Sequence, residues 1–368
     1  MEQVPPKGPA ASPSAAHDFD SISPSAYALL LMKALTPIPY AREAAALLPS
    51  FAPVTAGNFR DASFLMDPYK RSAGFWARVL HFESRYLAVD QLLSDLNATN
   101  VLELSSGFSF RGLALTRQRP VYYIDTDLPN LIATKRRFIE ALTGGVVAIP
   151  AAPAPAPTGE ASAASPMRGE PTGKPPSEPS ASAASPMRGE PTGKPASEPS
   201  ASAAPGAHYE LQPLNALDTA AFESITQRFP PGELTIVNEG LLVYLDTAEK
   251  ERVCQNIRDA LSKRGGSWIT ADIYLRSSTP RIFEEEKSDA FLKFVEQHNI
   301  EENKFSDFDE ARAFFSRMGF RVDRESNVDY STLSALPNLL AAASPEQLDR
   351  LRGMGRTPIH AIWRLRLA

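Results

Sequence analysis

The sequence predicts an α/β protein with a mostly parallel sheet, an antiparallel hairpin at one edge and a helical N-terminal segment. Three observations support this fold class. After Asn100, apolar runs of strand length alternate with helical patterns. The chain then ends in a strand, a helical connector and another strand, Phe320–Glu325 and Ile359–Leu367, which fits an added edge hairpin. Before Val101 the residues have helical spacing and little strand signal.

The N-terminal helices are predicted from the spacing of their apolar residues. The three stretches are Ser25–Leu35, Ala41–Leu48 and Gly74–Leu96. In the third, apolar residues recur at helical intervals: Trp76, Val79, Leu80, Tyr86, Leu87, Val89, Leu92 and Leu93. We therefore expect residues 21–96 to form a helical cap.

Five short apolar runs predict the parallel strands: Asn100–Leu104, Pro120–Ile124, Tyr209–Leu211, Leu234–Asn238 and Ser267–Ala271. Asp246 and Glu249 form a capping-box pattern that opens a helix, in which Cys254 is expected to be a packed core thiol. Ser306 is expected to precede a further helix that Gly319 ends. Another helix is expected to begin at Ser344-Pro345.

A duplicated low-complexity segment interrupts the α/β pattern. Ala161–Ser180 is repeated in Ala181–Ser200 with a single change, and residues 151–207 contain no Val, Ile, Leu, Phe, Trp, Tyr or Cys. Such a segment cannot bury enough apolar surface to offset its ordering entropy. We expect a disordered insertion over 150–207 and a disordered tail over 1–20. A ligand-binding domain then comprises 97–149 and 208–368.

Composition and charge exclude several classes of protein. The chain has 368 residues, a formal net charge of −5 and one Cys. An acidic chain lacks the electrostatic footprint of a nucleic-acid or membrane-surface binder, and one Cys cannot form an internal disulfide or a thiolate metal site. With no secretory h-region and no long apolar run, the expectation is a cytoplasmic protein with no metal, and its oligomeric state stays open.

The strongest candidate site begins where the first strand ends. Val101–Ser109 is an apolar strand that leads into a turn of small residues, including Ser105 and Gly107, and then a helix. Small residues let a ligand approach the backbone, and a helix N-terminus presents free N–H groups. About 20 residues on, Asp125 and Asp127 end the second strand, at the spacing that brings a carboxylate to ribose hydroxyls. The alternative is a solvated acidic strand end.

A third element of the candidate site follows the fourth strand. Glu239 interrupts the apolar run Thr235–Leu245 at the carboxyl end of a buried strand, where open α/β sheets bind ligands. It is expected to contact a cationic or hydroxyl-bearing ligand. A structural ion pair is the alternative.

These stretches together resemble the leucine carboxyl methyltransferase family, which includes bacterial O-methyltransferases of polyketide biosynthesis. The resemblance rests on four motifs. Leu104–Arg111 corresponds to the family's glycine motif, and Tyr123–Pro129, with Lys135, to its acidic strand. Glu239–Leu245 corresponds to the late E-G-x-x-x-Y-L motif, and Arg85–Asp90 to the upstream R-x-x-x-x-D helix. It implies a Rossmann-like class I methyltransferase fold, S-adenosyl-L-methionine as cofactor, and O-methylation of a small-molecule carboxylate or hydroxyl.

The resemblance also implies roles for individual residues. Arg85, with Arg78 as its rival, would hold the methionine carboxylate, and Glu239 would contact the methionyl ammonium or line the acceptor pocket. The backbone of Ser105 and Gly107 would pass beneath the cofactor. Asp127, with Asp125 as the near alternative, would hold the ribose. The adenine would lie against Leu214 and Asn215.

The acceptor and its chemistry are less specified. The five histidines are spread along the chain and outside the motifs, which favours structural or surface roles for them. It also favours either a carboxylate acceptor that needs no base or catalysis by proximity alone. No catalytic residue is assigned. The acceptor pocket is expected from the N-terminal helices and the 274–300 segment, through these residues: Tyr27, Leu31, Phe59, Phe75, Trp76, Phe283, Phe291 and Phe294.

Two other functions remain open at this stage. One is a degenerate cofactor-binding protein without turnover, because Ser105 stands where the family has Gly and Asn215 where it has an acid. The other is a nicotinamide-dependent oxidoreductase, which the absence of a full G-x-G-x-x-G fingerprint disfavours.

Overall fold

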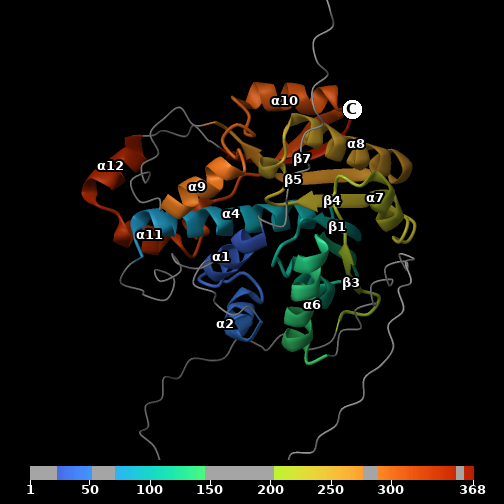
Figure 1. Ribbon diagram of the computed structural model, residues 1–368, viewed down its shortest axis with the longest axis horizontal. Helices are drawn as coiled ribbons and strands as arrows, with labels where there is room; N and C mark the ends of the chain where they lie inside the picture. The colour runs from blue at the N-terminus through green and yellow to red at the C-terminus, as the bar shows by residue number, and fades with distance from the viewer. Residues whose placement is uncertain (1–22, 52–70, 146–202, 277–288, 354–359) are drawn as a thin grey trace, which may run out of the picture.

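The computed structural model describes residues 23–51, 71–145, 203–276, 289–353 and 360–368 (Figure 1). The expected tail, most of the expected insertion, and Phe59 and Phe283 lie outside the described residues. Phe291 belongs to a described helix, but its side chain is also outside the description. Among the described residues, no helix combines the length and the apolar character of a membrane span.

One seven-stranded sheet organises the molecule, with strand order β3-β2-β1-β4-β5-β7-β6. Its strands are β1 (Asn100–Leu104), β2 (Tyr122–Asp127), β3 (His208–Pro213), β4 (Leu234–Asn238), β5 (Gly266–Tyr274), β6 (Phe320–Glu325) and β7 (His360–Leu367). The first five are parallel, whereas β7 lies antiparallel between β5 and β6. The predicted fold class, a Rossmann-like α/β fold whose mostly parallel sheet ends in an antiparallel hairpin at one edge, is confirmed.

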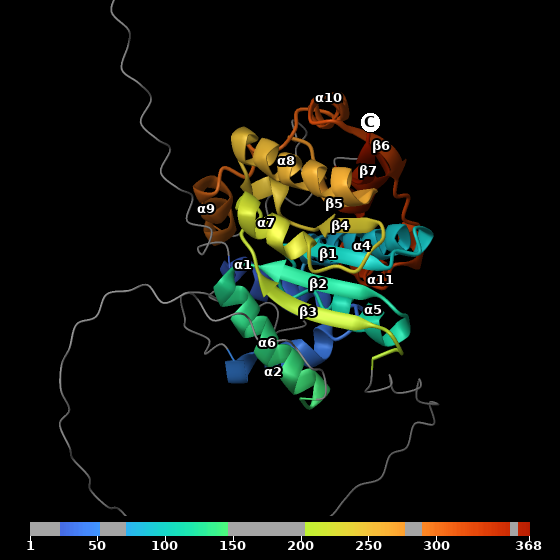
Figure 2. The ribbon, with the colours of Figure 1, turned by 90° about the vertical axis from the view of Figure 1, so that its right-hand side faces the viewer.

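Helices cover both faces of the sheet, as Figures 1 and 2 show. One layer contains α4 (Ala73–Asp95), α5 (Arg111–Gln118) and α6 (Pro129–Thr143), with α1 (Ser23–Lys33) and α2 (Ala41–Phe51) outside them. The opposite layer contains α7 (Thr219–Thr226), α8 (Thr247–Arg264) and α10 (Phe308–Arg317). Successive strand side chains alternate between the layers: Ile236 packs with α7 and α8, and Val237 with α4 and α6.

The remaining elements lie around the strand ends and the hairpin connection. They are η3 (Leu242–Tyr244), α9 (Asp289–Gln297), η5 (Tyr330–Thr332), α11 (Leu336–Ala342) and α12 (Pro345–Gly353). The first half of α4 packs with α11 and the end of α1 in a small cluster of its own that includes Met32, Phe75, Val79 and Leu339. The predicted N-terminal helices are thus present and rest on the sheet through α4.

Local signals set several boundaries. The capping box of Asp246 and Glu249 opens α8 as predicted, and Cys254 is a buried free thiol whose pKa is raised by burial. Ser306 precedes α10 as predicted, and the N-cap is Asp307, whose carboxylate accepts from the Glu310 N–H. Gly319 follows this helix with φ of +86°, a conformation that favours glycine.

Candidate functional site

The turn after β1 forms the centre of the candidate site. The parallel strands β1 to β5 end at one edge of the sheet, and in Figure 2 the tip of β2 points toward α1. Ser105 and Gly107 both have positive φ, +49° and +52°. A Cβ added at Gly107 would lie 3.9 Å from the Cβ of Ala26, so α1 covers this turn.

Asp127 joins this turn to the ends of β2 and β3. Its Oδ2 accepts a 2.8 Å hydrogen bond from the Gly107 N–H, and its Oδ1 accepts one of 2.7 Å from the Leu128 N–H. The Leu214 N–H donates to the Asp127 carbonyl at 2.8 Å. Burial raises the pKa of Asp127, while the two backbone donors oppose the shift. The structure therefore brings Gly107, Asp127 and Leu214 together, and the carboxylate retains lone pairs for a further donor.

Asp125 occupies a different environment. Its side chain is fully buried, with Oδ2 2.9 Å from the Nζ of Lys135 and 2.5 Å from the Oη of Tyr209, which donates to it. Lys135 also donates to the Ser106 hydroxyl at 2.8 Å. Asp125 thus supports the turn indirectly, because it pairs with Lys135, which donates to Ser106 in the turn. Its buried carboxylate is away from the exposed edge and out of reach of a ribose. This placement favours Asp127 over Asp125 as the ribose candidate.

Leu214 and Asn215 follow β3 at the same edge. Leu214 is buried, whereas Asn215 is exposed and its Oδ1 accepts from the Leu217 N–H at 3.0 Å. The Asn215 side chain therefore already serves a local turn.

Glu239, just after β4, is shared by three cations. Its Oε1 lies 3.1 Å from the Nζ of Lys33 and 3.3 Å from the Nη2 of Arg85, and its Oε2 lies 3.0 Å from the Nη2 of Arg111. Burial alone would raise the pKa of Glu239, but these positive charges hold it well below its usual range. The alternative stated for Glu239, a structural ion pair, is therefore present, but with three cations around one acid.

The loop that carries Glu239 is fixed by Asp272 of β5. Its carboxylate accepts from three successive backbone N–H groups, those of Gly240, Leu241 and Leu242, at 2.6 to 2.9 Å. Gly240 has φ of +90°, and a Cβ there would lie 3.5 Å from the Nη2 of Arg85. The glycine after Glu239 therefore lets the backbone turn beside the guanidinium.

Arg111, for which no role was predicted, is the buried centre of this cluster. Its side chain is fully buried and pairs with Asp90 at 2.6 Å and Glu103 at 2.5 Å as well as with Glu239. Arg111 and Asp90 close two of the quoted motifs, which is the one signal that could have identified them. Lys33 was also missed, although a lone lysine at the end of an apolar helix is seldom buried without a partner.

The charges in the cluster are unevenly distributed. Arg111 already has the carboxylates of Asp90 and Glu103, whereas Glu239 is the one carboxylate among the described residues that forms an ion pair with Lys33 and Arg85. The Nε of Arg85 is buried and has no hydrogen-bond partner among the described residues. The outer part of the cluster can therefore receive a further carboxylate.

Arg85, rather than Arg78, reaches Glu239. The two arginines are seven residues apart on α4, about two turns or 10 Å along the helix. Arg78 lies on the half of α4 that precedes the cluster.

The residues predicted to line an acceptor pocket have mixed surroundings. Tyr27 contacts Phe108 with ring centroids 4.9 Å apart, and Phe294 lies near Tyr244 at 6.3 Å. Phe75 is buried in the cluster between α4 and α11, which is core packing. Leu31 and Trp76 are partly buried against the same cluster. Their role around an acceptor stays a prediction.

Two histidines that are far apart in the sequence lie together in the structure. His81 of α4 and His360 of β7 meet Tyr274 at the end of β5, with the His81 Nε2 2.8 Å from the Tyr274 Oη. They are 279 positions apart in the chain, so spacing could not show that the fold brings them together.

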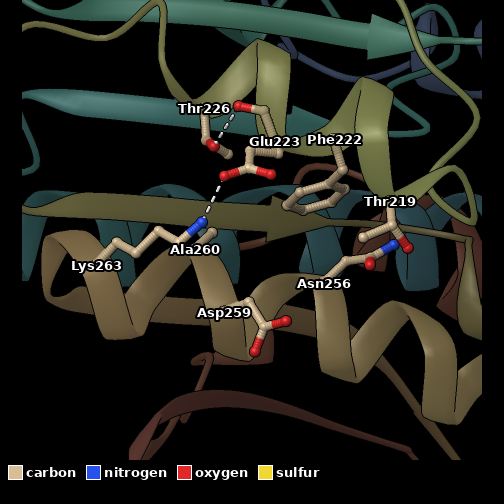
Figure 3. A pocket seen from close by; sticks show the side chains of 8 residues that line it. All are labelled: Thr219, Phe222, Glu223, Thr226, Asn256, Asp259, Ala260 and Lys263. Carbon is tan, nitrogen blue, oxygen red and sulfur yellow. Dashed lines mark hydrogen bonds and ion pairs between the residues drawn. The ribbon is translucent and has the colours of Figure 1, made fainter.

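A shallow pocket elsewhere contains none of the predicted site residues. It lies between α7 and α8, and Figure 3 shows its lining, in which Lys263 and Glu223 form a 2.5 Å ion pair between half-exposed side chains. A surface pair of this kind contributes little and marks no ligand site.

No protein-family model matches the chain, and no curated protein matches it. Among solved structures, the chain is similar to LepI in complex with SAM, with 9% identity over 74% of this chain and 43% of that chain and a TM-score of 0.36. The chain therefore spans less than half of LepI.

Two further solved structures are similar over more of their length. The mitomycin 7-O-methyltransferase MmcR is 11% identical over 90% of this chain and 69% of that chain, with a TM-score of 0.38. An O-methyltransferase family protein from Burkholderia thailandensis is 12% identical over 89% and 69%, with a TM-score of 0.37. Similarities this distant assign no residue and no substrate.

Proposed function

We propose that this chain is an S-adenosylmethionine-dependent O-methyltransferase related to the leucine carboxyl methyltransferase family and acting on a small molecule. The observation that carries the proposal is the sharing of Glu239 by three cations at the same sheet edge as Asp127 and Gly107. In this proposal residues 97–149 and 208–368 bind the cofactor, 21–96 form the cap, and 150–207 are a linker insertion.

The charges of the cluster fit the amino-acid end of the cofactor. A methionyl group carries one carboxylate and one ammonium, and the outer part of the cluster offers two cations, Lys33 and Arg85, and one acid, Glu239. Arg85, whose Nε has no partner among the described residues, and Lys33 would hold the carboxylate, and Glu239 would hold the ammonium. Binding would exchange ion pairs within the protein for ion pairs with the ligand, so few charges would be left buried and unpaired.

The nucleoside end fits the opposite part of the edge. Asp127 would accept from the ribose hydroxyls, and the backbone of Ser105 and Gly107 would lie beneath the cofactor. Leu214 and Asn215 would contact the adenine. Asp125 would act indirectly, by holding Lys135 against Ser106.

The bound cofactor would supply a methyl group already activated by its sulfonium. The protein then has to orient the acceptor and exclude water, because in-line placement accounts for much of such a transfer. The cap, through α1 over the turn after β1, is the described element placed to do this.

Calorimetric titration of the full chain with S-adenosylmethionine, S-adenosylhomocysteine and NAD tests the proposal. We expect both methionine-derived ligands to bind one per chain and NAD to give no heat of binding. Binding of NAD alone, or of none of the three, would contradict the proposal.

A degenerate binding protein without turnover is the second candidate. Two observations favour it: Ser105 adopts the positive φ at which the family has glycine, and the Asn215 side chain is engaged in its own turn. Release of S-adenosylhomocysteine over a panel of carboxylic acids, phenols and alcohols separates the two. Cofactor binding with no release on any member would favour the second candidate.

A further inference from the structure

Tyr274, the last residue of β5, lies between the cation cluster and a pair of histidines. Its Oη is 2.6 Å from the Nη1 of Arg85 and 2.8 Å from the Nε2 of His81. The ring of His360 lies 4.3 Å from that of Tyr274 and 4.9 Å from that of His81. Three elements distant in sequence, α4, β5 and β7, therefore place a phenol against an imidazole at the edge of the candidate site.

The direction of these hydrogen bonds follows from the groups present. A guanidinium can only donate, so the Tyr274 Oη accepts from Arg85 and its own proton must be donated elsewhere. The Nε2 of His81 is the acceptor within reach. Burial, and then the neighbouring His360 and Arg85, hold the pKa of His81 well below its usual range, which keeps the imidazole neutral and able to accept.

The Tyr274 oxygen can still accept one more hydrogen bond. A phenol oxygen has two lone pairs, and among the described residues Arg85 alone donates to it. Tyr274 is also partly exposed, as is His81. A hydroxyl group arriving at this edge could therefore donate to Tyr274.

The strand order places Tyr274 on the acceptor side. In the proposed function the cofactor extends from Asp127 at β2, past the turn after β1, to Glu239 at β4. The next strand along the sheet is β5, and Tyr274 ends it. In the proposed function the cofactor does not extend over the end of β5, so the acceptor can bind there.

Resting on the proposed function, we propose that the methyl acceptor is a hydroxyl compound, a phenol or an alcohol, and that Tyr274 and His81 take up its proton. The acceptor oxygen forms a bond to the methyl carbon as the bond from that carbon to the sulfonium sulfur breaks. The hydroxyl proton passes to the Tyr274 Oη while the phenol proton passes to the His81 Nε2, and solvent later removes the proton from His81. A carboxylate acceptor, ionised at neutral pH, would need neither residue.

The pH dependence of the reaction should report His81. The charged and titratable groups around its ring are Arg85, Tyr274, His360, Glu239 and Lys304. Because the pKa of His81 is lowered, the rate should hold as the pH falls through the ordinary histidine range near 6.5 and decline below it, when His81 becomes protonated.

The first test uses acceptors that contain both kinds of oxygen, 4-hydroxybenzoate, 4-hydroxyphenylacetate and 4-(hydroxymethyl)benzoate. Mass spectrometry before and after mild alkali distinguishes a methyl ether, which survives, from a methyl ester, which is hydrolysed. We expect ethers, and a rate lowered about 10²- to 10⁴-fold in His81→Gln, since glutamine can hydrogen-bond but cannot take the proton. Esters only, or no ether from any acceptor at any pH, would overturn the proposal.

Two controls separate proton uptake from a fault in folding. His81→Gln should bind S-adenosylhomocysteine with an unchanged Kd, because Lys33, Arg85 and Glu239 remain. His208→Gln, a part-buried histidine on β3 at the far side of the sheet, should keep the wild-type rate. An equal loss of rate in both variants, or a lost affinity in His81→Gln, would assign His81 a structural role only.

A readout without cofactor is the NMR titration of the histidine ring protons, with the His81 signal identified by its absence in His81→Gln. We expect His81 to titrate below the ordinary range, and Tyr274→Phe to raise its pKa because the neutral ring loses its donor. If Tyr274→Phe left the pKa of His81 unchanged, the proposed proton transfer from Tyr274 to His81 would be contradicted. If the wild type fails to bind S-adenosylmethionine, the proposed function fails; if it binds and yields only esters, the hydroxyl acceptor alone fails.

Discussion

Two acid–cation clusters lie at the carboxyl ends of β2 and β4, the strands on either side of β1, and they differ in their balance of charge. At β2, Asp125 and Lys135 pair one to one, with both side chains fully buried. Near β4, Glu239 faces Lys33, Arg85 and Arg111, and the two outer cations retain 10% and 6% exposure. A balanced pair needs nothing further, whereas surplus cations close to the surface can receive an anion. The ratio of cations to acids, more than the presence of an ion pair, therefore distinguishes a structural ion pair from a candidate binding site.

The substitution Asp125→Asn tests the structural role of the balanced pair. It leaves Lys135 buried without a charged partner, so the free energy of unfolding should fall by about 3–5 kcal/mol. Urea denaturation measures this, with the exposed Asp349→Asn as the control, expected within about 0.5 kcal/mol of wild type. The folded variant should still bind S-adenosylhomocysteine. If Asp125→Asn kept the stability of the wild type but no longer bound S-adenosylhomocysteine, Asp125 would belong to the binding site and this account of the two clusters would be wrong.

Arg85→Met tests the outer cations. Loss of a charged hydrogen-bond donor to the ligand should weaken the binding of S-adenosylhomocysteine by about 1.5–3 kcal/mol, or 10- to 150-fold in Kd. The matched control is Arg78→Met on the same helix, for which calorimetry should find an affinity close to wild type. A larger loss of affinity in Arg78→Met than in Arg85→Met would indicate that the ligand binds about two helical turns away, near Arg78.

Asp127→Asn separates the two acids of β2. The amide keeps an oxygen for the Gly107 N–H but has no charge to accept from ribose hydroxyls, so we expect Kd to rise about tenfold, or 1.4 kcal/mol. Adenosine inhibition of ligand binding provides a second readout at the nucleoside end. Unchanged affinity for both ligands would exclude Asp127 from ribose binding.

The smallest expected effect is on the pH dependence of stability. The pKa of Glu239 is lowered in the folded protein, so its ionised form stabilises the fold above the unfolded value near 4.3, and this contribution declines as the pH falls. The difference in unfolding free energy between wild type and Glu239→Gln should shrink by about 1 kcal/mol between pH 4.3 and 3.3. Urea titrations of both proteins measure it. A difference independent of pH would mean that Glu239 is not held ionised by its neighbours.

The sequence predicted the strands best where apolar runs end in clear breaks. β1, β4 and β6 match their predicted bounds, whereas β3 and β5 continue through polar residues beyond the predicted apolar runs. Asp127 remains paired with Pro213 of β3, and Asp272 is buried because it accepts from the loop after β4. Polar side chains that serve tertiary contacts resemble strand ends in a sequence.

The candidate site was predictable only in part, for a related reason. Arg85, Asp127, Gly107 and Glu239 lie in recognisable motifs, and the structure places them at one edge. Lys33 and Arg111 reach Glu239 from 206 and 128 positions away in the chain, and the pairing of His81 with Tyr274 spans 193. Such contacts depend on how α1, α4 and the sheet pack, which local patterns do not encode.

The most direct test of the central claim is a crystal structure of the full chain with S-adenosylhomocysteine. We predict the amino-acid carboxylate within hydrogen-bond distance of Arg85 and Lys33, the ammonium at Glu239 and the ribose hydroxyls at Asp127. A ligand bound elsewhere, or one bound at this edge with Glu239 still paired to all three cations, would contradict the account.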